Sequence, residues 1–327
     1  MKCIYLASNA YGSFVTLWLH ILRKIILYAL LRHSQMPSSG LIDLEGFQND
    51  FIRLPSKPSA RLSYLFRPQS QGETGSGQPQ RLLIFLSGID NRSKSWQAAI
   101  ASFIRLSQIR RLSIPPILIY DRYGIGLSDR HPSETDKHSK LRYSILEAMY
   151  DLHELVVQIA LEKLGYKEAE VHRLNIVFAS HSMGCFIARL YAQEYPGTVE
   201  ALLLIDSGIS NTAVQDFVPD PDRPTHVYKY NVPSDVTPDM CRLAIQRIMK
   251  SPFNFYGRNR EGMYWGNSPE LLPHNDAPRL RGPRSGLPLV TVVVNDPEVM
   301  NKSFAKASRN STALKGTHPH SYFSIDT

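Results

Sequence analysis

The sequence predicts an α/β fold: a mostly parallel sheet with helices on both faces. Short apolar runs typical of buried strands lie at residues 82–86, 116–120, 174–179, 199–205 and 287–294. Segments with helical apolar spacing, at 96–109 and 145–159, separate several of these runs. This alternation indicates crossover units and therefore a doubly wound sheet. With 43% hydrophobic and 20% charged residues, the 327-residue chain has enough apolar material for one large core.

The first half of this fold begins with residues 47–54 and 61–66, which we expect to form two antiparallel strands. A turn at Pro55 to Pro58 separates them. The polar stretch 69–79 is typical of a flexible loop, because glycine, serine and glutamine dominate it. The strand at 82–86 then leads into Ser87, Gly88, Ile89 and Asp90, and the helix at 96–109 leads into the strand at 116–120.

In the second half, the long helix at 145–159 leads to the strand at 174–179, and a further strand follows at 199–205. Between residues 208 and 284 the pattern weakens, since prolines interrupt its front half and only 239–250 has the composition of a helix. The run at 287–294 restores the pattern of a buried strand.

A serine follows the apolar run at 174–179. Ser182 has small residues two positions away on each side, Ser180 and Gly184, and residues 185–195 form a predicted helix that ends at Pro196. A tight strand-to-helix turn needs small residues at these positions, because larger side chains would make the strand and the helix collide. The pattern predicts that the turn exposes the Ser182 hydroxyl as a nucleophile near the amino end of a helix.

These residues, together with the run from Tyr120 to Asp129, resemble the α/β-hydrolase superfamily. The resemblance covers residues 47–294 and implies the α/β-hydrolase type of doubly wound sheet, with an inserted cap at about 208–285. It divides the chain into an apolar extension at 1–45 and a hydrolase domain at 46–327. The chain departs from the family at Ser180, where members carry glycine, and at Ser87, where histidine is common.

The resemblance also implies a catalytic triad in the order serine, acid, histidine. Asp296 follows the last predicted strand and is the expected acid; Asp206, at the end of the preceding strand, is the alternative, and Glu298 is a weaker one. His318 follows Gly316 in a turn similar to the one that presents the family's histidine, and His320 is the alternative base. The chain ends seven residues after His320, where family members continue with a closing helix.

For the oxyanion hole, the expected donors are the backbone N–H groups of Met183 and Ile89. Main-chain donors tolerate a change of side chain, so Ser87 in place of histidine leaves them intact. Asp90 leaves two alternatives. Its carboxylate either points into the hole, where it would repel a developing oxyanion, or turns outward as part of the loop.

Composition excludes several classes of function. The formal charge of +8 and pI near 9.3 come from scattered arginines without an aromatic or basic recognition module, so we expect no nucleic-acid partner. The three cysteines, Cys3, Cys185 and Cys241, are too few for a disulfide framework and favour a reducing, cytoplasmic location. No Cys/His spacing fits a metal and no glycine-rich loop fits a phosphate, so we expect neither a metal nor a cofactor.

The amino-terminal stretch at 11–31 is apolar but interrupted by His20, Arg23 and Lys24. Each central charge costs roughly 2.5 to 3.5 kcal/mol in a spanning helix, which weighs against one. Three alternatives stay open: an interfacial or signal-anchor helix, a transmembrane span, and an extension packed beside the domain. Membrane association through this segment is therefore one of the expectations.

The leading functional hypothesis is a serine hydrolase that cleaves a carboxylic ester or related small acyl substrate through an acyl-enzyme, without metal or cofactor. Amide or peptide cleavage is conceivable on the same fold. The alternative from another class is a catalytically inactive relative that binds a small apolar ligand in the cap pocket.

Overall fold

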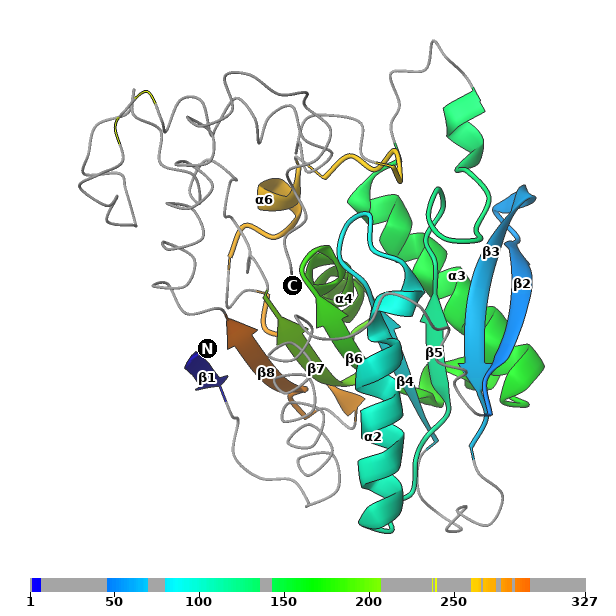
Figure 1. Ribbon diagram of the computed structural model, residues 1–327, viewed down its shortest axis with the longest axis vertical. Helices are drawn as coiled ribbons and strands as arrows, with labels where there is room; N and C mark the ends of the chain where they lie inside the picture. The colour runs from blue at the N-terminus through cyan, green and yellow to red at the C-terminus, as the bar shows by residue number, and fades with distance from the viewer. Residues whose placement is uncertain are drawn as a thin grey trace.

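The computed structural model places an eight-stranded sheet at the centre of the molecule. It describes residues 2–6, 46–69, 80–135, 143–206, 237, 239, 260–265, 267–274, 278–283 and 286–294. The strands follow the order β1-β8-β7-β6-β4-β5-β3-β2 across the sheet (Figure 1). Their bounds are β1 (Lys2–Leu6), β2 (Gln48–Leu54), β3 (Lys57–Arg67), β4 (Arg81–Leu86), β5 (Ile117–Tyr120), β6 (Asn175–His181), β7 (Val199–Ile205) and β8 (Leu289–Val294).

The central strands β5, β4, β6, β7 and β8 are parallel to one another. The strands β1, β2 and β3 at the two sides pair antiparallel with their neighbours. Between β5 and β6 the sheet order departs from the chain order, because β4 lies between them. The prediction of a mostly parallel sheet is confirmed, and the carboxyl ends of its central strands form one edge at which ligands bind in folds of this kind.

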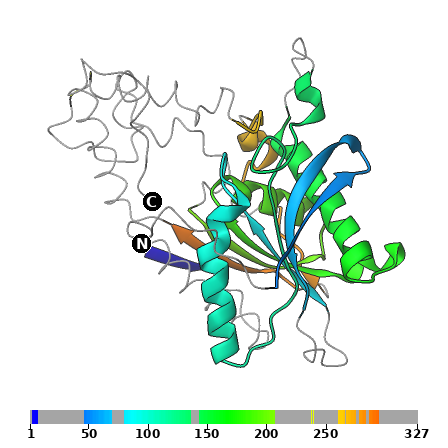
Figure 2. The same cartoon turned by 45° about the vertical axis from the view of Figure 1, so that its right-hand side comes forward.

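Helices cover both faces of the sheet (Figure 2). On one face α2 (Gln97–Ile109) buries Ile100 and Phe103 against a core that includes Phe85 of β4. On the other face α3 (Ile145–Lys163) and α4 (Met183–Glu194) bury their apolar sides in a larger core. Shorter helical turns are η2 (Ser93–Trp96), η3 (Pro132–Thr135), η4 (Glu168–Arg173) and α6 (Ser268–Leu271). The doubly wound architecture is therefore confirmed.

One sequence-based boundary is wrong at the first hairpin. The predicted turn at Pro55 to Pro58 is a two-residue turn, and β3 begins at Lys57 rather than at Arg61. Pro58 is tolerated in the strand because the register shifts there, between Arg53 and Leu54 on β2. A proline that has no N–H to donate fits at such a bulge, where the ladder is already interrupted.

The sheet edge next to β8 is formed by the amino terminus of the chain. Strand β1 pairs antiparallel with β8, from Lys2 opposite Val294 to Leu6 opposite Val290. The apolar stretch at 11–31 lies outside the described residues, so the alternatives for it stay predictions. Within the described parts of the chain, no helix has the length and apolar character needed to cross a membrane.

Two buried titratable side chains, Asp151 and His131, both interact with Lys57 of the first hairpin and have shifted pKa values. Asp151 on α3 is 2% exposed and pairs with Lys57. His131 is 3% exposed and stacks on Tyr143 with 4.4 Å between ring centroids. Burial raises the pKa of Asp151 to about 6, although its hydrogen bond to Lys57 opposes the shift. Burial, with the charge of Lys57, lowers the pKa of His131 to about 4.

The two shifts give stability changes of opposite sign with pH. Between pH 4 and 6.5, His131 is protonated in the unfolded chain but neutral in the folded protein, so acidification lowers the free energy of unfolding there. Between pH 3.8 and 6 the folded chain binds a proton on Asp151 that the unfolded chain does not, so acidification adds stability. Because each unit of pKa shift corresponds to about 1.4 kcal/mol, the two contributions nearly cancel in the unmodified protein.

Replacing either residue should expose the contribution of the other. We compare the free energy of unfolding of His131→Phe, which keeps the stacked ring, with that of the unmodified protein. As the pH falls from 7 to 4.5, we expect this difference to rise by roughly 2 kcal/mol in favour of the variant. For Asp151→Asn, the free energy of unfolding relative to the unmodified protein should fall by a similar amount over the same pH interval. Denaturant unfolding at several pH values measures both differences, and a difference that stays constant with pH in either variant would contradict the assignment.

Candidate functional site

Ser182 occupies a strained turn between β6 and α4. Its backbone has φ 51° and ψ −118°, outside the regions that a residue with a side chain ordinarily adopts. The turn is held by its backbone, since the N–H of Ser182 donates to the carbonyl of Ile205 at 2.9 Å and its carbonyl accepts from Cys185 at 2.9 Å. Ser182 is half-buried, at the carboxyl end of a central strand and at the first turn of α4.

Gly184, two positions after Ser182, must be small as predicted, but the contact that limits its size is with β4 rather than with the strand that leads into the turn. A Cβ atom added to Gly184 would lie 2.5 Å from the carbonyl oxygen of Leu86 on β4, closer than real contacts allow. Ser180 is fully buried, and its carbonyl accepts a bond from the thiol of Cys185 at 3.3 Å. At this position, where the resembled family carries glycine, the Oγ atom of Ser180 is buried and has no hydrogen-bond partner in the described part of the chain.

The 87–90 loop, which follows β4, lies directly against the strained turn at Ser182, which we call the elbow. A Cβ atom added to Gly88 would lie 3.2 Å from Cβ of Ser182 and 3.1 Å from Nδ1 of His181. The structure thus brings Ile89, the residue after Gly88, into the neighbourhood of Ser182 and Met183. Burial lowers the pKa of His181, with Asp206 opposing the shift.

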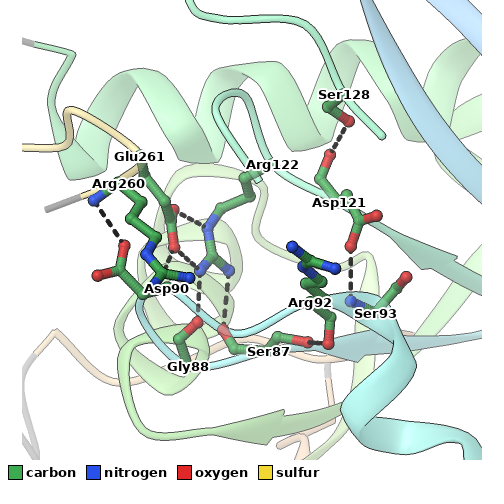
Figure 3. A network of polar contacts seen from close by, with 10 residues as sticks. All are labelled: Ser87, Gly88, Asp90, Arg92, Ser93, Asp121, Arg122, Ser128, Arg260 and Glu261. Atoms are coloured by element: carbon green, nitrogen blue, oxygen red, sulfur yellow. Dashed lines mark hydrogen bonds and ion pairs between the residues drawn. The ribbon is translucent and has the colours of Figure 1, made fainter. Parts of the chain in front are cut away.

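A buried ion pair between Arg122 and Glu261 fixes the backbone of this loop (Figure 3). Arg122 and Glu261 make a two-pronged contact, with Nε to Oε2 at 2.6 Å and Nη2 to Oε1 at 2.7 Å, and their side chains are 3% and 0% exposed. The same guanidinium donates to the carbonyls of Ser87 at 2.8 Å and Gly88 at 2.6 Å. Burial acts to lower the pKa of Arg122, but the charge and hydrogen bonds of Glu261 outweigh it and raise the pKa, so the guanidinium stays charged.

Asp90 faces the 260–265 segment. Its Oδ1 accepts the backbone N–H of Arg260 at 2.8 Å, and its own N–H donates to Oε1 of Glu261 at 2.6 Å (Figure 3). Burial and the neighbouring charge of Glu261 raise the pKa of the Asp90 carboxyl. Of the two alternatives for this side chain, the contacts favour a loop residue that is turned toward a neighbouring segment.

The run from Tyr120 to Asp129 supports this arrangement from β5. Asp121 accepts the N–H of Ser93 at 2.6 Å and that of Leu127 at 3.4 Å, and its carbonyl accepts from Ser128 at 2.6 Å. Gly126 has φ +60°, and a Cβ atom there would overlap the carboxylate of Asp121 at 1.8 Å. The motif thus has a scaffolding role that fixes Arg122.

Of the candidate acids and bases, the structure describes Asp206 alone. Asp206 directly follows β7, has φ 50°, and donates its N–H to the carbonyl of Val293 at 2.7 Å. It lies beside the elbow, because the preceding residue, Ile205, pairs with His181 and bonds to Ser182. Asp296, Glu298, His318 and His320 lie outside the described residues, so their roles stay predictions. In the described part of the chain, no three His, Cys, Asp or Glu side chains gather as a metal would require.

The Arg122–Glu261 pair is the feature of the site that the sequence did not reveal. Arg122 belongs to the motif from Tyr120 to Asp129, but a motif does not say what an arginine contacts. Glu261 is 139 positions further along the chain, in a stretch without regular apolar spacing. The signal that could have found the pair is weak: an arginine in a predicted buried loop requires a carboxylate partner.

The chain has an α/β-hydrolase fold, as its strand order, its strained serine elbow and the loop beside it show. Its sequence matches no protein-family model and no curated protein. The solved structures that are similar to this chain have low sequence identity and low TM-scores. Cfl2 from Burkholderia cenocepacia is 16% identical, with 84% of this chain and 75% of that chain covered and a TM-score of 0.36.

Two other structures are similar over shorter stretches. The mouse alpha/beta hydrolase domain-containing protein 10 is 15% identical, covering 52% of this chain and 53% of that one, with a TM-score of 0.34. A structure from a study of carboxylesterases of the thaumarchaeon Nitrososphaera gargenis is 17% identical, covering 51% and 49%, with a TM-score of 0.33. The chain thus spans about half the length of these two proteins, and these likenesses say nothing about substrate.

Proposed function

We propose that the protein is a serine hydrolase that cleaves carboxylic esters or related small acyl substrates through an acyl-enzyme. The observation that carries the proposal is the backbone of Ser182, at φ 51° and ψ −118°. A residue with a side chain in such a conformation costs on the order of 1–3 kcal/mol, and such strain is concentrated at functional sites. If residue 182 had only a structural role in the turn, a glycine there would avoid this conformational strain. The presence of serine therefore indicates that its hydroxyl group has a function.

In the proposed reaction, Oγ of Ser182 attacks the substrate carbonyl carbon while a histidine accepts the hydroxyl proton. The histidine is His318, with His320 as the alternative, and the carboxylate that orients it is Asp296, with Asp206 as the alternative. The backbone N–H groups of Met183 and Ile89 would stabilise the oxyanion, helped by the amino end of α4. Collapse of the intermediate expels the alcohol, which takes the proton from the histidine, and water then releases the acid by the same steps.

Two features support the oxyanion hole in this scheme. Met183 is the first residue of α4, and the first N–H groups of a helix have no partner within the helix. The 87–90 loop is in contact with Ser182 through Gly88, which leaves Ile89 within reach of the same space. A hole made of main-chain donors needs no particular side chain at Ser87.

Reaction with a fluorophosphonate probe tests the proposal and identifies the partners of the serine. We expect the unmodified protein to be labelled, Ser182→Ala to be unlabelled, and labelling to slow by at least about 100-fold in the variant that lacks the base. The variants His318→Ala and His320→Ala distinguish the two bases, and Asp296→Asn and Asp206→Asn distinguish the two acids. Absence of labelling in the unmodified protein would refute the proposal and favour an inactive relative that binds a ligand.

A further inference from the structure

Five hydrogen bonds converge on the Arg122–Glu261 pair, and three of them involve the backbone of the 87–90 loop. Arg122 donates to the carbonyls of Ser87 and Gly88, and Glu261 accepts from the N–H of Asp90. The remaining two bonds join the two charged side chains to each other. Three peptide groups within four residues are thus fixed by one ion pair that is almost completely buried.

Fixing these carbonyls also fixes the N–H groups of the loop. A peptide unit is planar and trans, so its C=O and its N–H point in opposite directions. Because the carbonyl of Gly88 is drawn to Arg122, the N–H of Ile89, which belongs to the same peptide unit, must point away from Arg122. The carbonyl of Ser87 sets the direction of the Gly88 N–H in the same manner.

The pair also ties the loop to a distant part of the chain. Glu261 belongs to the 260–265 segment, within the region that the family resemblance assigns to the cap. Gly124 allows this segment to approach, since a Cβ atom there would lie 2.7 Å from the carbonyl oxygen of Arg260. The segment is anchored again at Tyr264, which donates its N–H to Tyr143 at 2.6 Å and accepts from Ile145 at 3.1 Å.

We propose that Arg122 and Glu261 are the positioning residues of the oxyanion hole, and that the hole is correctly oriented only when the 260–265 segment is docked on the 87–90 loop. This inference rests on the proposed function, because it assigns a role within the same site. Neither side chain contacts the reacting atoms in the proposed reaction. They act through the direction of the Ile89 N–H.

A paired substitution tests this role without leaving a buried charge unpaired. Removal of one member of a buried pair is strongly destabilising, whereas replacement of both by apolar side chains of similar volume is often neutral. We therefore expect the double variant Arg122→Met, Glu261→Met to fold. With p-nitrophenyl butyrate as substrate, its kcat should fall about 10- to 100-fold while KM changes less than about threefold, because a misdirected donor weakens the transition state rather than binding.

The chain offers a matched control in Arg81 and Glu200. This pair has the same two-pronged geometry, with contacts at 2.6 Å and 2.9 Å, but it joins β4 and β7 near their amino ends, far from Ser182. The double variant Arg81→Met, Glu200→Met should keep kcat within about twofold. A further variant, Arg122→Lys, keeps the charge but cannot reproduce the fork, so its kcat should lie between those of the unmodified protein and the double variant.

The outcomes separate the two proposals. If the unmodified protein shows no turnover that depends on Ser182, the proposed function fails and the positioning role fails with it. If turnover is present and both Arg122 variants match the unmodified kcat, the positioning role alone is overturned. A loss of kcat in the Arg81 and Glu200 control of the same size would also overturn it, because the effect would then follow from loss of any ion pair. If the double variant does not fold, the kcat of Arg122→Lys decides: a lower kcat than that of the unmodified protein supports the positioning role, and an equal kcat overturns it.

Discussion

Ser182→Gly is expected to stabilise the protein while abolishing its reaction with esters. Glycine adopts φ 51° and ψ −118° without the steric cost that a Cβ atom imposes. Relief of on the order of 1–3 kcal/mol of strain exceeds the roughly 0.5–1 kcal/mol that glycine costs through the unfolded chain. We expect a net gain of about 1 kcal/mol, seen as a melting temperature raised by roughly 2 °C, and at least about a 1,000-fold loss of ester turnover.

Ser182→Ala is the matched control for this prediction. Alanine keeps the Cβ atom and therefore the strain, but removes the hydroxyl. Its melting temperature should stay close to that of the unmodified protein, and its turnover should be lost to the same degree as in the glycine variant. If the glycine variant is no more stable than the alanine variant, the backbone of Ser182 is not strained in the way described.

Gly184→Ala is expected to be among the most destabilising single changes in the described part of the chain. At an ordinary helix position this substitution would stabilise by about 1 kcal/mol. Here the added Cβ atom would lie 2.5 Å from the backbone oxygen of Leu86 and 2.8 Å from its carbonyl carbon, so β4 and α4 must move apart. We expect a cost of roughly 3 kcal/mol, together with a lower kcat, because the 87–90 loop follows β4.

Gly165→Ala is the control for the Gly184 variant. Gly165 has φ +73° and nothing within 4 Å of an added Cβ atom, so the substitution should cost only the roughly 1 kcal/mol of a left-handed backbone conformation, with no change in turnover. Denaturant unfolding of both variants measures the difference. Equal costs would mean that the contact between α4 and β4 does not limit the size of residue 184.

Local patterns predicted most of the scaffold because buried strands and amphipathic helices leave direct traces in the sequence. The run at 199–205 is β7, residue for residue, and the spacing from 145 onward is α3, whose start is capped by Ser144 and Glu147. The tight turn at Ser182 was also predictable, because the strand, the serine with its small neighbours and the helix follow one another directly in the sequence, although the contact that limits Gly184 is with distant Leu86. The prediction of this part of the fold used patterns between residues that are close in the sequence.

Contacts between distant segments were not predictable in this way. Glu261 reaches Arg122 across 139 positions, and no periodicity marks its segment. The pairing of β1 with β8 joins the two ends of the described chain, and the orientation of Asp90 depends on Arg260. The strand at Lys57 was missed because a proline normally ends a strand, and a bulge overrides that rule here. The roles of Asp296, His318 and His320 still depend on the family resemblance.

Mass spectrometry of the protein after reaction with a fluorophosphonate identifies which residue is the nucleophile. Trypsin cuts after Arg173 and Arg189, so Ser180 and Ser182 lie in one peptide whose fragments distinguish them. We expect a single phosphonylated residue, Ser182, with buried Ser180 unmodified. An adduct on any other residue, or an unmodified peptide after complete incubation, would contradict the assignment of Ser182 as the nucleophile.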